Sequence, residues 1–214
     1  MDFKLLSISR HRLTTDGEGV TSLVALAGCP LRCPLCINKE LLALGKVHIV
    51  SPEKLLENVM KDYCYFVATG GGITFGGGEP LIQAEAILDF FKLRPEGLNV
   101  NIETSMNVDI PDDILKKICE EATSFIIDTK STDPQLYKKY TGLDNDRVFK
   151  NLEKIKSFGF EDKCILRVPI IPKFKNKEAA LKEKEYLISK GFNNINVFPY
   201  IIRDYMDKDF LSKK

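Results

Sequence analysis

Short apolar runs alternate with longer amphipathic segments along most of the chain. The short runs are rich in Val, Ile, Leu and Phe and are predicted to be β-strands. There are six of them, at residues 22–27, 72–75, 99–103, 124–128, 164–169 and 194–198. Their alternation with helical segments is the signature of βα units arranged around a parallel sheet.

The longer segments carry apolar residues three or four positions apart, which is the period of an amphipathic helix. They are predicted to be helices at residues 52–61, 84–92, 112–121, 147–158 and 178–190. Ser51 and Pro52 are typical of an N-cap followed by proline at the first helical position. Gly159 and Gly191 stand where a residue with left-handed backbone commonly ends a helix.

The chain is predicted to form one domain over residues 1–214, with its core at about residues 13–200 and a short C-terminal tail at residues 201–214. A chain of 214 residues, 44% hydrophobic and 29% charged, can bury one sizeable core, and no linker or repeat divides it. A complete eight-stranded barrel typically needs about 250 residues. Six units in this length predict an α/β fold: an incomplete (β/α)6 barrel of parallel strands, or an open parallel sheet.

The charges are balanced and scattered. The formal charge of +1 comes from 31 basic and 30 acidic side chains, with no polybasic block or acidic tail, so neither nucleic acid nor a membrane is expected as a partner. Residues 1–13 lack the pattern of a secretory signal, and no apolar stretch approaches the ~20 residues that cross a bilayer. The protein is therefore expected to be cytoplasmic, where disulfides are rare, and its six cysteines are interpreted as thiols or metal ligands.

Three of these cysteines stand close together directly after the first predicted strand. Cys29, Cys33 and Cys36 have the spacing C-x3-C-x2-C, which chance would produce in roughly 0.5% of shuffled versions of this chain. Iron–sulfur clusters are usually held by four cysteine thiolates. Since no fourth cysteine lies nearby, one iron would keep an open position, as a catalytic metal requires.

A zinc site is the alternative for the same segment, with Cys33 and Cys36 as a CxxC pair. No second CxxC pair and no pair of histidines supplies the other ligands, which disfavours this alternative. The remaining cysteines, Cys64, Cys119 and Cys164, are expected to be small buried hydrophobic residues.

With this loop in place, the chain resembles the radical SAM superfamily, and most of all the activating enzymes of glycyl radical enzymes. The resemblance is carried by Asp16-Gly17-Glu18-Gly19, Gly28-Cys29-Pro30-Leu31-Arg32-Cys33, Ile73-Thr74-Phe75-Gly76-Gly77-Gly78-Glu79-Pro80-Leu81, Glu103-Thr104-Ser105, Asp128-Thr129-Lys130, Tyr140-Thr141-Gly142 and Ile165-Leu166-Arg167-Val168-Pro169. It implies a [4Fe-4S] cluster on Cys29, Cys33 and Cys36 and reductive cleavage of S-adenosyl-L-methionine to a 5′-deoxyadenosyl radical. The implied substrate is a glycine in a partner glycyl radical enzyme, with a flavodoxin or ferredoxin as electron donor.

Polar residues follow the predicted strands at the end where parallel α/β folds collect their active sites. Gly77 and Gly78 let a ligand approach the backbone, and the loop carbonyls and Glu79 can accept hydrogen bonds from an ammonium group. The resemblance implies that this loop holds the amino group of S-adenosylmethionine, whereas a run of glycines alone predicts a tight turn.

The next strand ends carry charged residues. Asp128 and Lys130 are two positions apart and face the same side if the strand continues, although such a pair is usually a solvated ion pair. The resemblance implies that they contact the cofactor or the substrate peptide. Arg167 is expected to face the pocket and bind a carboxylate, and the alternative is a structural ion pair with Glu103 or Asp128. Glu103 and Ser105, with Thr104, are expected near the cofactor, or as caps of a following element.

The sequence also departs from the activating enzymes. Pro199-Tyr200 is followed by Ile201 where these enzymes have a histidine, with Arg203 as a possible substitute. The residue before the third cysteine is Leu35 instead of an aromatic residue, so adenine must stack elsewhere, and Met106 replaces a glycine. Two alternatives follow: a radical SAM enzyme acting on a small molecule or peptide, and a non-catalytic cluster-binding sensor or scaffold.

Overall fold

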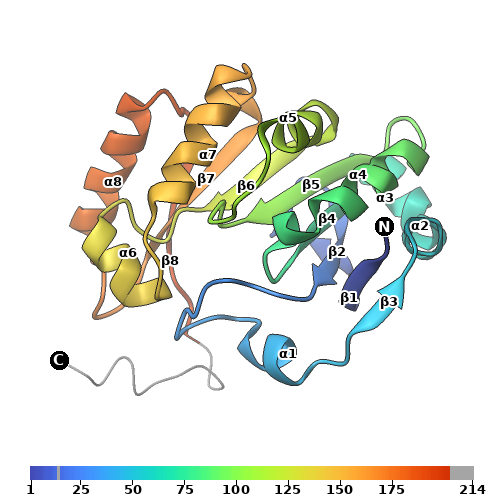
Figure 1. The fold of residues 1–214 in the computed structure, drawn as a ribbon, viewed down its shortest axis with the longest axis horizontal. Coiled ribbons are helices and arrows are strands. Elements are labelled where there is room, and N and C mark those ends of the chain that lie inside the picture. Colours follow the sequence, from blue (N-terminus) through green and yellow to red (C-terminus); the bar gives the residue numbers. More distant parts are fainter. Residues whose placement is uncertain (14, 203–214) are drawn as a thin grey trace.

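One open sheet of eight strands runs through residues 1–13 and 15–202, the part of the chain that the computed structural model describes (Figure 1). Across the sheet the strands are β3 (His48–Val50), β1 (Phe3–Leu13), β2 (Val20–Leu26), β4 (Gly72–Gly77), β5 (Asn99–Thr104), β6 (Ser124–Asp128), β7 (Cys164–Ile170) and β8 (Ile195–Pro199). The six strands from β2 to β8 are parallel. Each of the six lies within two residues of its predicted bounds, so the α/β prediction is confirmed.

Two antiparallel strands were not predicted. β1 pairs with β2 on one side and with β3 on the other, and β3 forms one edge of the sheet. The pairing of β1 with β2 shifts register between Leu5 and Ser7 and again between Ser9 and Arg12. Such irregularities break the alternation of apolar and polar residues that identifies a strand in sequence. β3 is only three residues long and leaves little pattern to detect.

The helices accompany the strands as the βα pattern predicts. The structure has α1 (Lys39–Leu44), α2 (Pro52–Val59), α3 (Tyr63–Thr69), α4 (Ala84–Leu93), α5 (Asp112–Glu121), α6 (Pro134–Thr141), α7 (Asp146–Ser157) and α8 (Lys177–Ser189), with short 3-10 turns η1 (Met60–Asp62), η2 (Pro80–Gln83) and η3 (Glu161–Lys163). The five predicted helices are α2, α4, α5, α7 and α8. Ser51 caps α2 by accepting a hydrogen bond from the amide of Lys54, and Gly159 and Gly191 have positive φ after α7 and α8.

The main core lies between the helices and one face of the sheet. Phe75 of β4 stacks on Phe3 of β1 and meets Phe90 of α4 edge to face, with ring centroids 5.4 Å apart in both cases. Alternate residues of the same strands face the other way. There Thr74 and Asn101 are hydrogen-bonded to each other at 3.3 Å. One face of the sheet is therefore apolar and covered, while the other carries polar groups.

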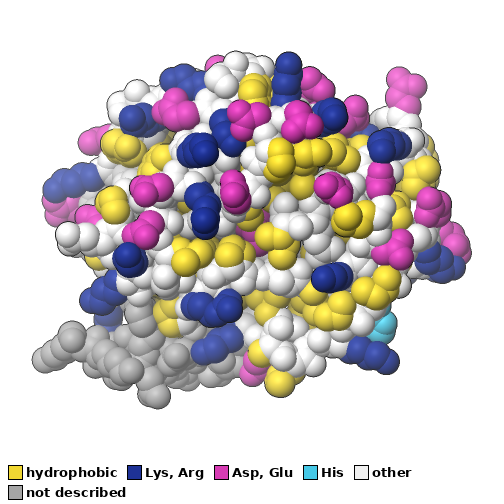
Figure 2. Space-filling model, in the orientation of Figure 1, with side chains coloured by type: hydrophobic (Ala, Val, Ile, Leu, Met, Phe, Trp, Pro, Cys, Tyr) yellow, Lys and Arg dark blue, Asp and Glu magenta, His cyan; other side chains and the backbone are white. Residues whose placement is uncertain are grey.

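The cysteines outside the loop differ in burial. Cys119 and Cys164 are buried, as expected, but Cys64 is exposed and that prediction is wrong. Cys64 lies on α3, a helix of seven residues in which Phe66 alone is buried, so the cysteine falls on the solvent side. The surface that Figure 2 shows has acidic and basic side chains interspersed. No helix among the described residues combines the length and apolar character needed to cross a membrane.

Candidate active site

The cysteine loop follows β2 and is held by segments far away in sequence. The Arg32 amide donates to the carbonyl of Thr141 at the end of α6, at 2.8 Å. Leu35 is fully buried against Tyr140 and Ile171, and the Tyr200 hydroxyl donates to the Leu35 carbonyl. Leu35 therefore fills a small apolar cluster and offers no free face for adenine, as expected.

The three thiols lie together and beside charged groups. The pKa of Cys33 is raised to about 11, chiefly by burial, while the ammonium of Lys130 acts in the opposite direction and the charges of Cys36, Cys29 and Asp128 add to the increase. Burial also raises the pKa of Cys29. Cys29 and Cys33 are therefore protonated near neutral pH without a metal, and metal binding must release their protons.

The glycine loop after β4 packs directly against the cysteine loop. A Cβ atom at Gly78 would stand 2.0 Å from the carbonyl oxygen of Gly28, so only glycine fits there, and Gly77 has a φ of 88°. The amide of Glu79 donates to the same Gly28 carbonyl at 2.8 Å, and the Asn38 side chain donates to the Gly77 carbonyl at 2.7 Å. The two loops thus form one unit at the carboxyl edge of the sheet.

Glu79 is buried, with 1% of its surface exposed, and joins this unit to the end of β5. One carboxylate oxygen accepts from the Thr104 hydroxyl at 2.6 Å and the Leu81 amide at 3.2 Å. The other accepts from the Ser105 amide at 2.8 Å and the Ser105 hydroxyl at 2.7 Å. Burial raises the pKa of Glu79, and the hydrogen bonds from Ser105 and Thr104 counteract this. Both oxygens are already occupied, so an ammonium group would find the loop carbonyls rather than this side chain.

Four charged side chains alternate in sign across the ends of β5, β6 and β7. Arg167 lies 2.8 Å from Glu103 and 3.1 Å from Asp128, and Lys130 lies 2.8 Å from Asp128. Each side chain is between 19% and 24% exposed. The structure therefore contains the ion pairs with Glu103 and Asp128 that were the alternative for Arg167. Asp128 and Lys130 also form an ion pair, but it is largely buried and not the solvated pair that was their alternative.

The network shifts the pKa values of its two carboxylates in opposite directions. Burial and then repulsion from Asp128 raise the pKa of Glu103 to about 7, against the attraction of Arg167. Burial also acts to raise the pKa of Asp128, but the charges of Lys130 and Arg167 outweigh it and the pKa is lowered. Arg167 also lies 5.1 Å from the ring centroid of Phe198 on β8, which helps fix its orientation.

All the predicted site residues therefore gather at the carboxyl ends of five neighbouring strands. Ser105 is 8% exposed and donates to Glu79, which precedes it in the sequence, so this contact is not the cap of a following element that was the alternative. Sequence reasoning gave no role to Asn38 or Lys175; Asn38 follows the last cysteine by two positions, whereas nothing in the pattern singles out Lys175. Ile201 is 66% exposed, and Arg203 lies outside the described residues.

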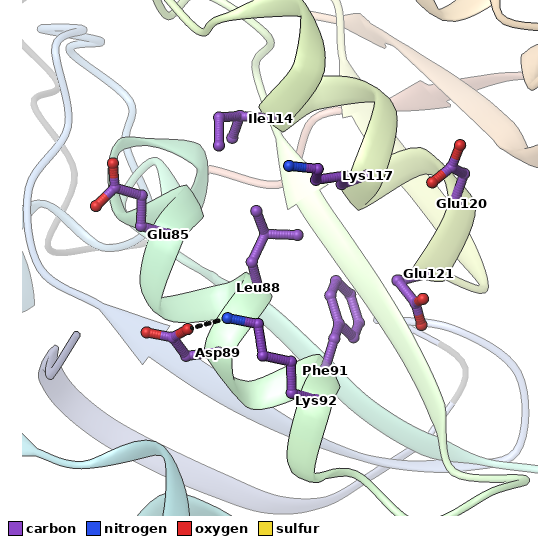
Figure 3. A pocket seen from close by; sticks show the side chains of 9 residues that line it. All are labelled: Glu85, Leu88, Asp89, Phe91, Lys92, Ile114, Lys117, Glu120 and Glu121. Atoms are coloured by element: carbon purple, nitrogen blue, oxygen red, sulfur yellow. Dashed lines mark hydrogen bonds and ion pairs between the residues drawn. The ribbon is translucent and has the colours of Figure 1, made fainter.

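Two surface hollows are built from other residues. One, of about 500 Å3, lies between α4 and α5 and is lined by Leu88, Phe91, Ile114 and charged side chains, including the Asp89–Lys92 ion pair (Figure 3). The second, of about 510 Å3, reaches Pro30 in the cysteine loop. Neither contains a predicted site residue.

Comparison with known proteins gives consistent matches. The sequence model of the radical SAM superfamily matches residues 23–183. The (2S)-3-sulfopropanediol dehydratase activating enzyme of Klebsiella oxytoca is 38% identical over 58% of this chain and 38% of its own length. The pyruvate formate-lyase 2-activating enzyme of Escherichia coli is 29% identical over 92% of this chain and 77% of its own, and the pyruvate formate-lyase-activating enzyme of Clostridium pasteurianum 28% identical over 86% and 77%.

Solved structures match the fold at low sequence identity. Native anSMEcpe with bound AdoMet has a TM-score of 0.65 and 17% identity, covering 84% of this chain and 52% of that one. Streptococcus suis SuiB bound to S-adenosylmethionine has a TM-score of 0.64 and 16% identity, covering 84% and 40%. The chain thus spans about half of these proteins or less, and the likeness concerns the fold.

Proposed function

The chain belongs to the radical SAM superfamily, and from this premise we propose that it cleaves S-adenosyl-L-methionine reductively and activates a glycyl radical enzyme. The observation that carries the proposal is the meeting of three thiols, a glycine loop and a line of alternating charges at one edge of a parallel sheet. The curated relatives described above are all activating enzymes, two of them matched over more than three quarters of their length.

The donor set suits a [4Fe-4S] cluster on Cys29, Cys33 and Cys36. All three side chains are partly exposed, unlike buried Cys119 and Cys164, so a metal group can reach them. Among the described residues, no three His, Cys, Asp or Glu side chains are arranged to hold a single metal ion. Bound and reduced, the cluster supplies the electron that divides S-adenosylmethionine into methionine and a 5′-deoxyadenosyl radical.

The surrounding residues suit a zwitterionic nucleoside ligand. Carbonyls of the Gly77–Gly78 loop can accept hydrogen bonds from its ammonium group, while Glu79 and Ser105 hold that loop in place. Lys130 and Arg167 supply positive charge for its carboxylate. The carboxylates of Glu103 and Asp128 can accept hydrogen bonds from ribose hydroxyls.

The partner in this proposal is a protein that presents a backbone glycine. The face of the sheet opposite the helices carries polar residues, and β8 is the last strand of the sheet among residues 1–13 and 15–202, so an extended segment could approach the strand ends. The electron would come from a flavodoxin or ferredoxin, because three thiols can hold only one cluster of this kind and no second cysteine motif exists.

The first test measures cleavage. Reconstituted protein incubated anaerobically with dithionite and S-adenosylmethionine should form 5′-deoxyadenosine, and Cys33→Ala should lose both iron and product. Cys64→Ala is the matched control, since this exposed cysteine lies on α3 outside the loop, and it should retain both. Wild-type protein with a full cluster and no product would reject the proposal.

A second test separates the possible substrates. Incubation with a glycyl radical enzyme whose gene neighbours the gene of this protein should give the electron paramagnetic resonance signal of a glycyl radical. Product formation without that signal would favour a small-molecule or peptide substrate, an alternative suggested by Ile201 in place of histidine. Binding of S-adenosylmethionine without cleavage would favour a sensor or scaffold.

A further inference from the structure

Lys175 and Glu183 form an ion pair inside the protein, although nothing in the sequence predicts it. Lys175 lies in the loop between β7 and α8, and Glu183 lies on α8. Their side chains are 0% and 7% exposed, and the ammonium nitrogen is 2.6 Å from the carboxylate. A buried pair of this kind often stabilises a protein no more than apolar residues of the same volume. Its role must therefore be sought in its other contacts.

Those contacts converge on the loop that follows β6. The Lys175 ammonium also donates to the backbone carbonyl of Lys130, at 2.7 Å. The hydroxyl of Ser131 donates to the second oxygen of Glu183, at 2.5 Å. The pair therefore holds two consecutive residues, Lys130 and Ser131, which begin two positions after Asp128, the last residue of β6.

Lys130 is the residue in this loop that needs to be held. Its φ is 56°, a left-handed conformation that residues other than glycine keep only when the surroundings impose it. In this conformation its ammonium lies 2.8 Å from Asp128. Lys130 and Cys33 are also close enough that the charge of each changes the pKa of the other. If the loop relaxed, the ammonium would leave this position.

We propose that Lys175 and Glu183 are positioning residues, which hold the backbone of Lys130 so that its ammonium stays on Asp128 and within electrostatic range of Cys33. The inference rests on the proposed function, which makes Cys33 a ligand of the cluster. A cation fixed within electrostatic range of a ligand sulfur stabilises the reduced form, so this arrangement would raise the reduction potential of the cluster.

The test compares three variants. The double variant Lys175→Met/Glu183→Gln removes both buried charges while keeping similar volumes, so no unpaired ion remains inside. Lys130→Met removes the ammonium directly. Arg10→Met/Asp62→Asn is the matched control, because Asp62 is also fully buried and paired but lies at η1, with Ser22 of β2 as a partner. Cluster potential is measured without S-adenosylmethionine, and amide hydrogen exchange is measured on cluster-free protein.

The double variant should speed exchange at residues 129–133 and shift the potential to a more negative value, in the same direction as Lys130→Met. The control should leave both at the wild-type values. Unchanged exchange in the double variant, or an unchanged potential in either site variant, would overturn the inference. If the wild type binds a cluster but cannot cleave S-adenosylmethionine, the proposed function is rejected. Hydrogen exchange and reduction potential can still be measured in that case, and they decide whether Lys175 and Glu183 position Lys130. If no cluster binds, hydrogen exchange alone decides it.

Discussion

At the scale of single residues, Glu79 determines how the strand ends fit together. Its carboxylate accepts four hydrogen bonds from Leu81, Thr104 and Ser105 and is almost fully buried. Each carboxylate oxygen faces one backbone amide, of Leu81 or Ser105, which can only donate, so both positions require an acceptor. The glycine loop is therefore held to β5 by the charge state and geometry of one side chain.

Replacing this carboxylate by an amide should show that dependence. In Glu79→Gln, the amide nitrogen must face at least one of the donors, which leaves a buried group unsatisfied and should cost about 1–3 kcal/mol of unfolding free energy. Urea denaturation measures this, with Glu85→Gln as control because Glu85 is exposed on the neighbouring helix α4. Equal stability of the two variants would contradict the assigned role.

Met106 shows two opposing effects at one residue. Its φ is 58°, a conformation that favours glycine, yet its side chain is fully buried. In Met106→Gly, relief of backbone strain gains about 1–3 kcal/mol, whereas removal of a buried methionine side chain costs about 2–5 kcal/mol. The loss is the larger effect, so thermal unfolding should show a less stable variant.

Gly70→Ala measures the cost of backbone strain alone, without the loss of side-chain packing that accompanies Met106→Gly. Gly70 has a φ of 69° and no atom within 4 Å of the added Cβ position, so alanine there adds strain without a clash. Its cost should be about 1–2 kcal/mol. A Met106→Gly variant more stable than the wild type would mean that strain at this loop exceeds the packing contribution.

At the scale of secondary-structure elements, Asp62 connects the second and third strands of the sheet, β1 and β2, to η1. It is fully buried at the end of η1 and accepts hydrogen bonds from Arg10 of β1 and Ser22 of β2, and it pairs with His11 at 2.9 Å. The hydrogen bond from Arg10 is the largest cause of the lowered pKa of Asp62. Burial acts in the opposite direction and Ser22 adds to the decrease.

Asp62→Asn should therefore lower stability in a pH-dependent way. We expect a loss of about 1–3 kcal/mol at neutral pH, because Arg10 is partly exposed while its partner is not. Because the pKa of Asp62 is lower in the folded protein than its ordinary value of 3.8, the ionised carboxylate stabilises the protein fully above pH 3.8. This contribution is lost as the pH falls through the pKa of the folded state. Unfolding curves should show the same difference in unfolding free energy between wild type and Asp62→Asn from pH 7 down to about pH 3.8, and a smaller difference at lower pH. Glu57→Gln removes one partner of an exposed ion pair and should show almost no difference from wild type.

At the scale of the whole molecule, the cysteine loop lies apart from the main core. Its buried residue Leu35 belongs to a separate cluster with Tyr140 and Ile171, whereas the strands and helices pack around a larger apolar cluster. The sheet, not the metal site, therefore organises the fold. This separates the requirements of folding from those of chemistry.

Cys33→Ala should accordingly fold without its cluster. Its far-ultraviolet circular dichroism should match that of cluster-free wild type, and the thermal midpoint should move by only a few degrees, because one partly buried side chain is lost. A spectrum of an unfolded chain would show that the metal drives folding, as in small zinc domains.

The sequence alone determined the six parallel strands, five helices and the cysteine loop. These features are local: burial of one face imposes a period of two or about 3.6, and neighbouring cysteines share one loop. Gly77, Gly78 and the charged residues at strand ends also followed from the βα order, because parallel strands bring their carboxyl ends to one edge.

Tertiary structure decided what each side chain contacts. β1 became a strand through pairing with β2 despite its irregular pattern, and Cys64 became exposed because only one side of α3 meets the core. Glu79 turned inward to Ser105, Arg167 paired with two carboxylates, and Lys175 of the loop after β7 reached the carbonyl of Lys130 in the loop after the neighbouring strand β6. Such partners are distant in sequence, so their contacts depend on how the sheet brings strand ends together, which no local pattern encodes.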